Sequence, residues 1–230
     1  MKASNVVAVP FEVGAALSHR RFFHPAGVLA DGALERLAPP GVGLPMGSGR
    51  IVGRLSKGLG TPGALPDFAG LAWRMQPAPF AATPWDVLLV SAGVGSGASA
   101  PDRMLLRPVT SWSGAAYSSL MPLRYRDELW WIRARLVRGA SEGGLAVAAA
   151  AHAIDAVGVE FDIEQGCGTA EFAPLARLTL TEVITSDDAG QHIAFDPVRH
   201  TAPGVAVWPE WLREIRGAAY RGSREGRDAG

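Results

Sequence analysis

The sequence has a single cysteine, Cys167, among its 230 residues. One thiol cannot form a disulfide within the chain, and it cannot supply a zinc site built from several cysteines. A chain of this kind suits a reducing compartment such as the cytosol. We therefore expect a fold whose stability does not depend on disulfide bonds.

The sequence also has no apolar run of the roughly 18–20 residues that a membrane-spanning helix needs. Residues 1–17 are mildly apolar, but they lack the basic region, the unbroken apolar core and the cleavage site of a secretion signal. We expect these residues to form an arm that packs on the body of the protein. Together these features predict a soluble, cytoplasmic protein.

Neither sign of charge is in excess. The 22 Lys and Arg residues balance the 22 Asp and Glu residues, so the formal net charge at pH 7 is zero. Such a chain has no overall attraction to nucleic acid or to anionic lipid, and neither is an expected partner. Lysine occurs only as Lys2 and Lys57, so the positive charges are nearly all arginines, and a local cluster of them could still bind an anion.

Hydrophobic residues make up 48% of the chain, which is enough for one sizeable core. No internal repeat and no long low-complexity linker divides the sequence, so we expect a single domain over residues 1–230. Its expected parts are an N-terminal arm at 1–19, barrel strands at 20–140, a helix with further strands at 141–208, and a C-terminal helix at 209–227.

Short segments with strand-like alternation, separated by loops rich in proline and glycine, predict a series of strands. The segments are 20–27 (a strand entering a turn), 28–37, 50–56, 67–75, 84–90, 117–125, 129–136, 159–164, 176–184 and 191–195. The alanine-rich residues 144–157 have helical spacing and predict an amphipathic helix. Short strands divided by turn signals are typical of an antiparallel barrel or sandwich, so we predict an α+β fold with a β-barrel core.

The predicted C-terminal helix carries an unusual arrangement of arginine and tyrosine. It begins with Pro209 and a glutamate, which is a good helix N-terminal signal. In a continuous helix, Arg216, Tyr220 and Arg227 share one face. A phenol ionises near pH ~10, and neighbouring cations favour its anionic form, which binds hard, oxidised metal ions. The same spacing also fits a charged surface helix in which the tyrosine has no special role.

Several other chemistries are poorly supported. Residues 93–97 resemble half of a dinucleotide-binding loop, but the residues after them do not predict a helix. A Ser-His-Asp hydrolase is possible on residue types alone. Of the five histidines, His24 stands out because two arginines and two phenylalanines precede it, whereas His152 fits an ordinary helix position. No pair of histidines has zinc-ligand spacing with a third ligand nearby.

Four segments in the first half of the chain resemble, in order, motifs of the haem catalase superfamily. The distal-histidine segment is similar to Arg21-x-x-His24-Pro25-Ala26-Gly27-x-x-Ala30-x-Gly32-x-x-Glu35. The R-F-S strand of the family is similar to Arg54-Leu55-Ser56. The next two strands of the family, R-G-(F/L)-A-x-(K/R) and W-D-L, resemble residues 67–75 and 85–88.

The resemblance continues into the C-terminal half. Residues 117–124 are similar to the S-x-x-P-Y-R stretch of the small catalase-related peroxidases. The proximal region of the family resembles residues 193–197, then 202–205, and finally Arg216-x-x-x-Tyr220, which matches its R-x-x-x-Y haem-ligand motif. The likeness covers residues 20–227 and is nearest to the small peroxidases and the allene oxide synthases. It implies a catalase-like barrel whose C-terminal proximal helix carries the haem-ligand tyrosine.

This resemblance implies haem b as the cofactor, with Tyr220 as the proximal iron ligand in its tyrosinate form. Arg216 would hydrogen-bond the phenolate oxygen and keep it deprotonated. Three further arginines match the residues that bind the haem propionates, where charge-assisted and often bidentate bonds form. These arginines are Arg21, Arg54 and Arg227.

On the distal side, the resemblance implies that His24 is the general base, which takes a proton from the peroxide and returns it to the leaving oxygen. Ser56 matches the serine that orients this histidine. Where catalases have an asparagine shortly after W-D-L, this chain has Val90 or Ser91. A pocket without that amide donor holds hydrogen peroxide less well and favours bulkier peroxides.

We therefore predict a haem peroxidase that acts on organic hydroperoxides, with weak catalase activity. The alternatives are a hydroperoxide isomerase or dehydratase, and a non-catalytic haem-binding or ligand-binding protein of the same fold. The resemblance and the apolar N-terminal arm also suggest a homodimer.

Overall fold

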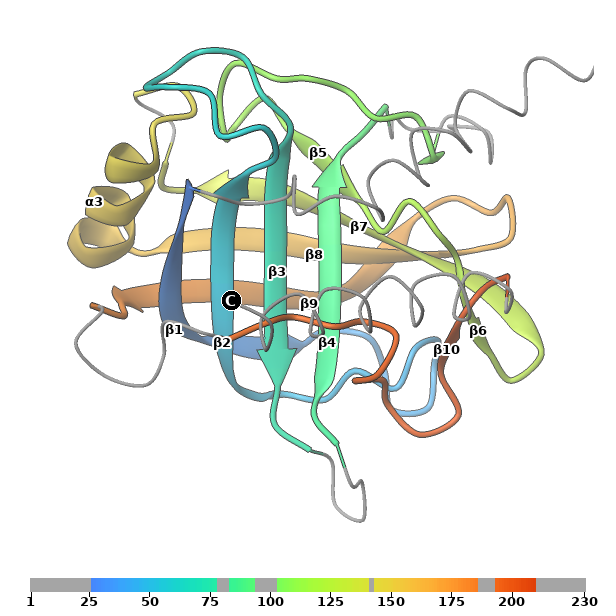
Figure 1. The fold of residues 1–230 in the computed structure, drawn as a ribbon. Coiled ribbons are helices and arrows are strands. Elements are labelled where there is room, and N and C mark those ends of the chain that lie inside the picture. Colours follow the sequence, from blue (N-terminus) through green and yellow to red (C-terminus); the bar gives the residue numbers. More distant parts are fainter. Residues whose placement is uncertain (1–25, 78–82, 94–102, 141–142, 186–192, 210–230) are drawn as a thin grey trace, which may run out of the picture.

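The computed structural model describes residues 26–77, 83–93, 103–140, 143–185 and 193–209. Within these ranges, strands and the helix α3 form a barrel with loops at both ends (Figure 1). The strands are β1 (Ala26–Arg36), β2 (Gly49–Lys57), β3 (Ala69–Met75), β4 (Trp85–Ser91), β5 (Ala116–Ser118), β6 (Leu123–Tyr125), β7 (Glu128–Arg138), β8 (Val159–Cys167), β9 (Ala173–Val183) and β10 (Ala206–Val207). Helix α3 spans Val147–Val157 and begins after a glycine-containing turn.

Eight of the strands close into an antiparallel barrel in the order β1, β2, β3, β4, β5, β7, β8, β9 and back to β1. Strand β7 is long enough to pair with two strands on one edge. Its Ala134 faces Tyr117 of β5, and its Trp130 faces Leu123 of β6. Strand β10 then pairs with β6 and extends the sheet. Closure pairs the backbone groups that an open sheet would leave exposed at its edges.

The interior of the barrel is a packed core. Side chains alternate between the two faces of each strand, so every second residue points inward. Trp73, Tyr117 and Phe161 are each 0% exposed, and the rings of Tyr117 and Phe161 meet edge to face at 5.7 Å. Burial raises the pKa of Tyr117 far above its ordinary value. Because the interior is filled, a sizeable ligand has to bind outside the barrel.

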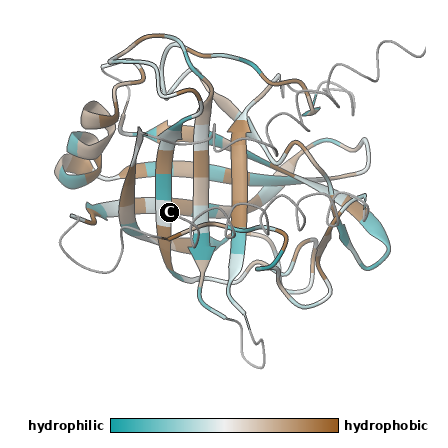
Figure 2. Ribbon diagram, in the orientation of Figure 1, coloured by the Kyte–Doolittle hydropathy of each residue, from teal (hydrophilic) through white to brown (hydrophobic). Residues whose placement is uncertain are grey.

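The outer face of the barrel differs from one side to the other. On β7, β8, β9 and β1, one cross-strand row reads Arg135, Asp162, Arg177, Glu35. Arg177 bonds Asp162 at 2.9 Å, and Arg135 bonds Glu164 at 2.9 Å. In Figure 2, β8 and β9 carry hydrophilic bands, as do β2 and the end of β3, whereas β4 is mainly hydrophobic along its length. The side formed by β7, β8 and β9 is therefore called the charged side, and the outer face of β4 carries the apolar residues Leu88 and Val90.

The predicted antiparallel barrel is confirmed, as are the strands at 50–56, 67–75, 84–90, 129–136, 159–164 and 176–184 and the helix at 144–157, apart from shifts at their ends. Three local predictions are wrong. Ala26 and Gly27 already belong to β1, so they do not form a turn. The single strand at 117–125 is two strands, because Leu120 has a φ of 55° and interrupts the extended backbone. Residues 193–195 form no strand.

Two further expectations concern the ends of the chain and the membrane. The N-terminal arm and the helix at 209–227 lie outside the described residues, except for Pro209, so the division of the chain into parts stays a prediction. In the described part of the chain, no helix has both the length and the apolar character needed to cross a bilayer.

A close approach of two backbones occurs at Gly32, where the pairing of β1 with β9 shifts register between Asp31 and Gly32. A Cβ atom at Gly32 would collide with the backbone oxygen of Thr179, whereas one at Gly49 would meet nothing within 4 Å. Because the colliding atom is backbone, the strands would have to move apart to relieve the clash.

We expect Gly32→Ala to lower the free energy of unfolding by about 1–3 kcal/mol, the usual cost of overpacking. Gly49→Ala is the matched control and should change it by less than about 0.5 kcal/mol. Urea denaturation of both variants measures the difference. Equal stability of the two variants would contradict the close approach of β1 and β9.

Candidate functional site

The outer face of β1–β4 presents two neighbouring rows of small or apolar residues, which together are called the site face here. The strand register places the residues of each row directly beside one another. The first row is Gly27, Ser56, Gly70 and Val90, and the second is Leu29, Arg54, Ala72 and Leu88. Arg54 is the one charged side chain of these eight. Neighbouring strands lie about 4.8 Å apart, so each row extends about 14 Å across the four strands.

Small side chains on the site face allow close approach to the strand backbone. A Cβ atom added at Gly27 would lie 2.9 Å from Nε of Arg54 and 2.8 Å from the backbone oxygen of Leu55. These distances are shorter than real Cβ contacts. The missing side chain of Gly27 therefore lets the Arg54 side chain lie close to β1, and it leaves backbone accessible to a flat molecule.

Arg54 also lines a cavity of about 540 Å³ between α3 and the barrel. Its apolar walls come from α3, with Val147 and Ala151, and from the end of β9, with Val183 and Ile184. Burial lowers the pKa of Arg54, because a charged guanidinium loses hydration there. A carboxylate in contact with Arg54 would offset that loss. The cavity is within the size range of small-molecule sites.

Helix α3, which forms one wall of this cavity, is firmly packed on the barrel. Its Ala150 and Ile154 are fully buried. The carboxylate of Asp155 accepts a hydrogen bond of 2.8 Å from the backbone N–H of Val183. The backbone N–H of Ile184 donates to the oxygen of Leu29 at 3.0 Å, so the wall from β9 is tied to β1.

The end of β2, where Ser56 lies, is also fixed. Ser56 is 2% exposed, and the next residue, Lys57, points inward and donates to the backbone oxygens of Gly63 and Leu65.

The carboxylate of Asp67 holds the same loop, which follows β2. Burial by itself raises the pKa of Asp67, but four hydrogen bonds to its carboxylate outweigh this and lower the pKa below its ordinary value. Three of these bonds come from backbone N–H groups and one from the hydroxyl of Thr61.

The structure distinguishes the two residues that stand where an asparagine is expected. Val90 lies on the site face, in the same row as Ser56. Ser91 points the other way and is 0% exposed. Its hydroxyl donates to the backbone oxygen of Arg107 at 2.7 Å and accepts from the N–H of Ala69 at 3.1 Å. The site face therefore carries an apolar side chain at this position.

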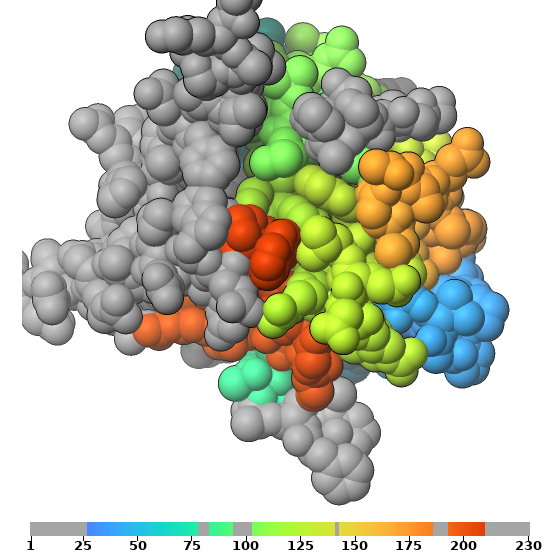
Figure 3. Space-filling model, turned by 90° about the vertical axis from the view of Figure 1, so that its right-hand side faces the viewer, coloured from blue at the N-terminus to red at the C-terminus, as the bar shows by residue number. Residues whose placement is uncertain are grey.

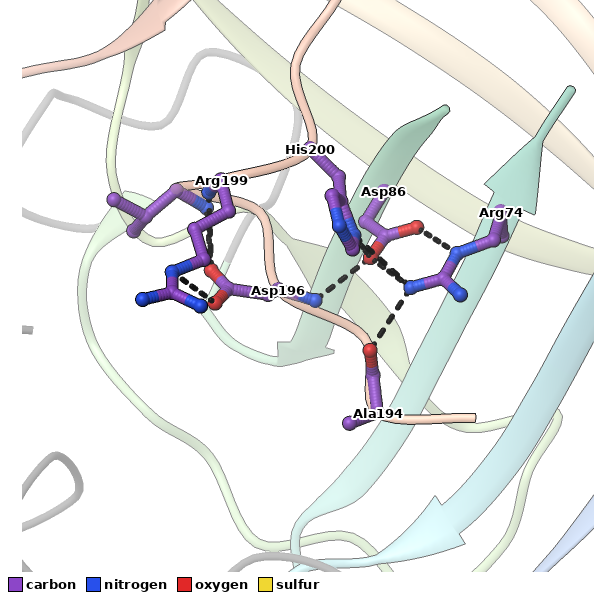
Figure 4. A network of polar contacts seen from close by, with 7 residues as sticks. Arg74, Asp86, Ala194, Asp196, Arg199 and His200 are labelled. Atoms are coloured by element: carbon purple, nitrogen blue, oxygen red, sulfur yellow. Dashed lines mark hydrogen bonds and ion pairs between the residues drawn. The ribbon is translucent and has the colours of Figure 1, made fainter. Parts of the chain in front are cut away.

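A polar network lies at one end of the site face (Figure 4). Asp86 of β4 and Arg74 of β3 are cross-strand partners, and they form two bonds of 2.7 Å. The hydrogen bond from Arg74 to Asp86 raises the pKa of Arg74, and nearby negative charges add to this. Asp86 also accepts from the N–H of Asp196 at 2.7 Å, and Nδ1 of His200 lies 2.8 Å from it.

This network attaches residues 193–209 to the outer side of β3 and β4, which the segment crosses in Figure 1. The far end of the segment is held at β6. Val207 pairs with Leu123, and the N–H of Trp208 donates to the oxygen of Pro122 at 2.9 Å. Arg124 lies over the Trp208 ring at 5.6 Å. Figure 3 shows this end of the segment beside the residues of β6 and β7.

Two of the predicted site residues, Arg54 and Ser56, belong to the described residues, and the structure places both on the site face. The other five, Arg21, His24, Arg216, Tyr220 and Arg227, lie outside the described residues. Among the residues that are described, no group of three His, Cys, Asp or Glu side chains is arranged to hold a metal ion.

The sequence analysis did not identify the network of Arg74, Asp86, Asp196 and His200. Asp86, Leu88 and Val90 lie on the same face of β4. A single carboxylate on an otherwise apolar strand face was therefore the sequence signal that could have indicated a buried polar network. Its partners lie as far as 114 residues away, a separation that strand periodicity does not bridge.

Comparison with known proteins shows the fold. No protein-family model matches the sequence, and no curated protein matches it. Among solved structures, catalase A from Saccharomyces cerevisiae is similar with a TM-score of 0.60 and 9% identity, over 94% of this chain and 63% of that chain. A fungal catalase is similar with a TM-score of 0.56 and 9% identity, over 94% and 61%. This chain thus spans less than two thirds of either catalase and has a catalase-like fold.

The opposite directions of Val90 and Ser91 can be tested through stability. Ser91→Ala removes two buried hydrogen bonds and leaves their backbone partners unsatisfied, so we expect the free energy of unfolding to fall by about 1–3 kcal/mol. The exposed Ser113 is the control, and Ser113→Ala should cost less than about 0.5 kcal/mol. Guanidinium denaturation checks both values. Similar small losses in the two variants would contradict the inward direction of Ser91.

Proposed function

We propose that this protein is a haem peroxidase that reduces organic hydroperoxides. The observation that carries the proposal is the site face: on a catalase-like barrel, Arg54 and Ser56 stand beside each other on a surface of mainly small and apolar residues. A planar apolar macrocycle with carboxylate groups at its edge matches such a surface. The filled interior supports the same location, because it leaves only the outside of the barrel for a large ligand.

The residues that are described fit haem b. The small residues Gly27, Gly70 and Ala72 lie on the site face, and Arg54 is a half-buried cation for a propionate. Arg21 and Arg227 are proposed as the other propionate-binding residues. Tyr220 is proposed as the iron ligand, with Arg216 one helical turn before it to keep the phenol ionised. When bound, haem supplies the iron chemistry that cleaves the O–O bond of a peroxide.

The proposed work of the chain itself is proton transfer. His24 takes the proton from the hydroperoxide and returns it to the oxygen that leaves, which departs as an alcohol. Ser56, buried at the end of β2, holds the histidine ring in orientation. The apolar Val90 on the same row offers no hydrogen bond to a small polar peroxide, and it favours a substrate with an apolar substituent.

Haem binding is the first test. Full-length protein mixed with haemin should develop a Soret band and the weak charge-transfer band typical of tyrosinate ligation. Arg54→Leu removes a charge-assisted bond and should weaken haemin binding by about 10–100-fold. The control is Arg177→Leu on the charged side of the barrel, for which we expect unchanged affinity.

Titration followed at the Soret band measures these affinities. A wild-type protein that does not bind haemin would rule out the proposed function. Identical spectra for the wild type and Tyr220→Phe would show that Tyr220 is not the iron ligand.

Substrate preference is the second test. Val90→Asn places an amide donor on the site face and should raise the activity toward hydrogen peroxide relative to cumene hydroperoxide, because it adds a hydrogen bond of about 0.5–1.5 kcal/mol. Steady-state rates with the two peroxides give the ratio. An unchanged ratio would argue against Val90 as a determinant of specificity.

The catalytic and non-catalytic hypotheses are separated by His24. His24→Ala should retain haem and lose peroxide-dependent dye oxidation. Undiminished turnover in this variant would remove His24 from the mechanism. Haem binding without turnover in the wild type, tested with several hydroperoxides, would favour a haem-binding protein that is not a peroxidase.

A further inference from the structure

Asp86 is the most completely enclosed carboxylate of the network at the end of the site face. Its side chain is 0% exposed, whereas the side chain of its partner Arg74 is 23% exposed. A buried carboxylate is tolerated only where cations and hydrogen-bond donors compensate for its lost hydration. Asp86 has both: one cation from β3, and further donors from a segment more than 100 residues later in the chain.

These later donors all belong to residues 193–209. The N–H of Asp196 donates to Oδ2 of Asp86 at 2.7 Å. Nδ1 of His200 is 2.8 Å from the same oxygen and 3.0 Å from a terminal nitrogen of Arg74. Because a carboxylate only accepts, a hydrogen bond between His200 and Asp86 requires a proton on Nδ1. The backbone adds a third link, since the N–H of Asp86 donates to the oxygen of His200 at 2.9 Å. Asp86 therefore holds the segment through both its side chain and its backbone.

Arg74 reinforces the same attachment. One of its terminal nitrogens donates to the oxygen of Ala194 at 2.9 Å, and the guanidinium lies 5.6 Å from the centre of the Phe195 ring. Within the segment, the carboxylate of Asp196 accepts from the N–H groups of Val198 and Arg199 and forms a turn. The buried pair on β3 and β4 thus organises a folded piece of chain on the site face.

An ordinary surface ion pair does not have these properties. Asp162 and Arg177 are also cross-strand partners, with a bond of 2.9 Å, but their side chains are 33% and 42% exposed. Exposed pairs contribute little to stability. Both residues of that pair lie on strands of the barrel, on its charged side, and the further ion pair of Arg177, with Glu160, is also to a barrel strand.

The attachment of residues 193–209 bears on Tyr220, the proposed iron ligand, because Tyr220 follows this segment closely in the sequence. Pro209 is the last described residue, and Tyr220 comes 11 residues later. Eleven residues span at most about 40 Å even when fully extended, because each adds no more than about 3.6 Å. The attachment of residues 193–209 therefore limits how far from β3 and β4 Tyr220 can lie.

We propose that Asp86 is a positioning residue for the haem site: by holding residues 193–200 against β3 and β4, it fixes the start of the chain that carries Tyr220. The inference rests on the proposed function. Asp86 acts through His200 and Asp196 and does not touch the cofactor.

The test uses full-length protein and two variants that break the attachment at different points. Asp86→Asn removes the buried charge, and His200→Ala leaves the pair of Asp86 and Arg74 intact, so it remains informative even if Asp86→Asn does not fold. His200→Asn restores a donor close to the position of Nδ1. Asp162→Asn is the matched control, because it removes the same kind of carboxylate from the charged side of the barrel.

Haemin affinity, measured at the Soret band, should fall by about 10–100-fold in Asp86→Asn and His200→Ala, as is usual when a residue that supports a metal ligand is lost. His200→Asn should recover much of the affinity, and Asp162→Asn should match the wild type. The charge-transfer band should weaken in Asp86→Asn and His200→Ala. In the haem-free state, hydrogen exchange of residues 193–200 should be faster in these two variants than in the wild type.

The outcomes separate the two proposals. If the wild type does not bind haemin, the proposed function fails, and this inference fails with it. If the wild type binds haemin and both Asp86→Asn and His200→Ala bind it equally well with unchanged spectra, the proposed function stands and the positioning role is overturned. A loss of affinity in Asp162→Asn equal to that in His200→Ala would also overturn it, since the effect would then be general destabilisation.

Discussion

Closure of an eight-stranded barrel around a filled interior is the constraint on which the rest of this structure depends. Side chains of a strand alternate between two faces, and here the inward face is occupied by a packed core that includes Trp73 and Phe161. The outward side chains of the strands are then the ones available to contact water or a ligand. The protein uses one side of the barrel for ion pairs that face water and the other for small and apolar residues that suit a ligand.

The site face depends on features that act together. Gly27 has no side chain, so Arg54 can lie close to β1, where burial lowers its pKa and favours a carboxylate partner. Lys57, the residue after Ser56, points inward and ties the end of β2 to the loop that follows. Asp86 is buried beside these rows and attaches the 193–209 segment. Among the described residues, the polar groups Lys57 and Asp86 on this side are thus held by partners within the chain.

The likeness to two fungal catalases concerns the barrel, because identity is 9% and this chain spans 63% or less of each catalase. Function has to be argued from the site. The features that favour haem are Arg54 and the small and apolar residues around it, and the feature that favours an altered substrate is Val90. A catalase-like barrel with an apolar residue at this place is consistent with a peroxidase for bulkier peroxides, which is what we propose.

Local sequence was sufficient for most of the strands, because a period of two is visible in segments such as 50–56 and 84–90, and loops rich in proline and glycine bound them. The predicted strand at 50–56 is also enough to put Arg54 and Ser56 on one face, since residues two apart in a strand point the same way. Only the tertiary structure decided which strands are neighbours, that Val90 and not Ser91 faces the site, and that Asp86 meets His200. The physical reason is that strand periodicity is local, whereas register and buried ion pairs are set by contacts between segments far apart in the chain.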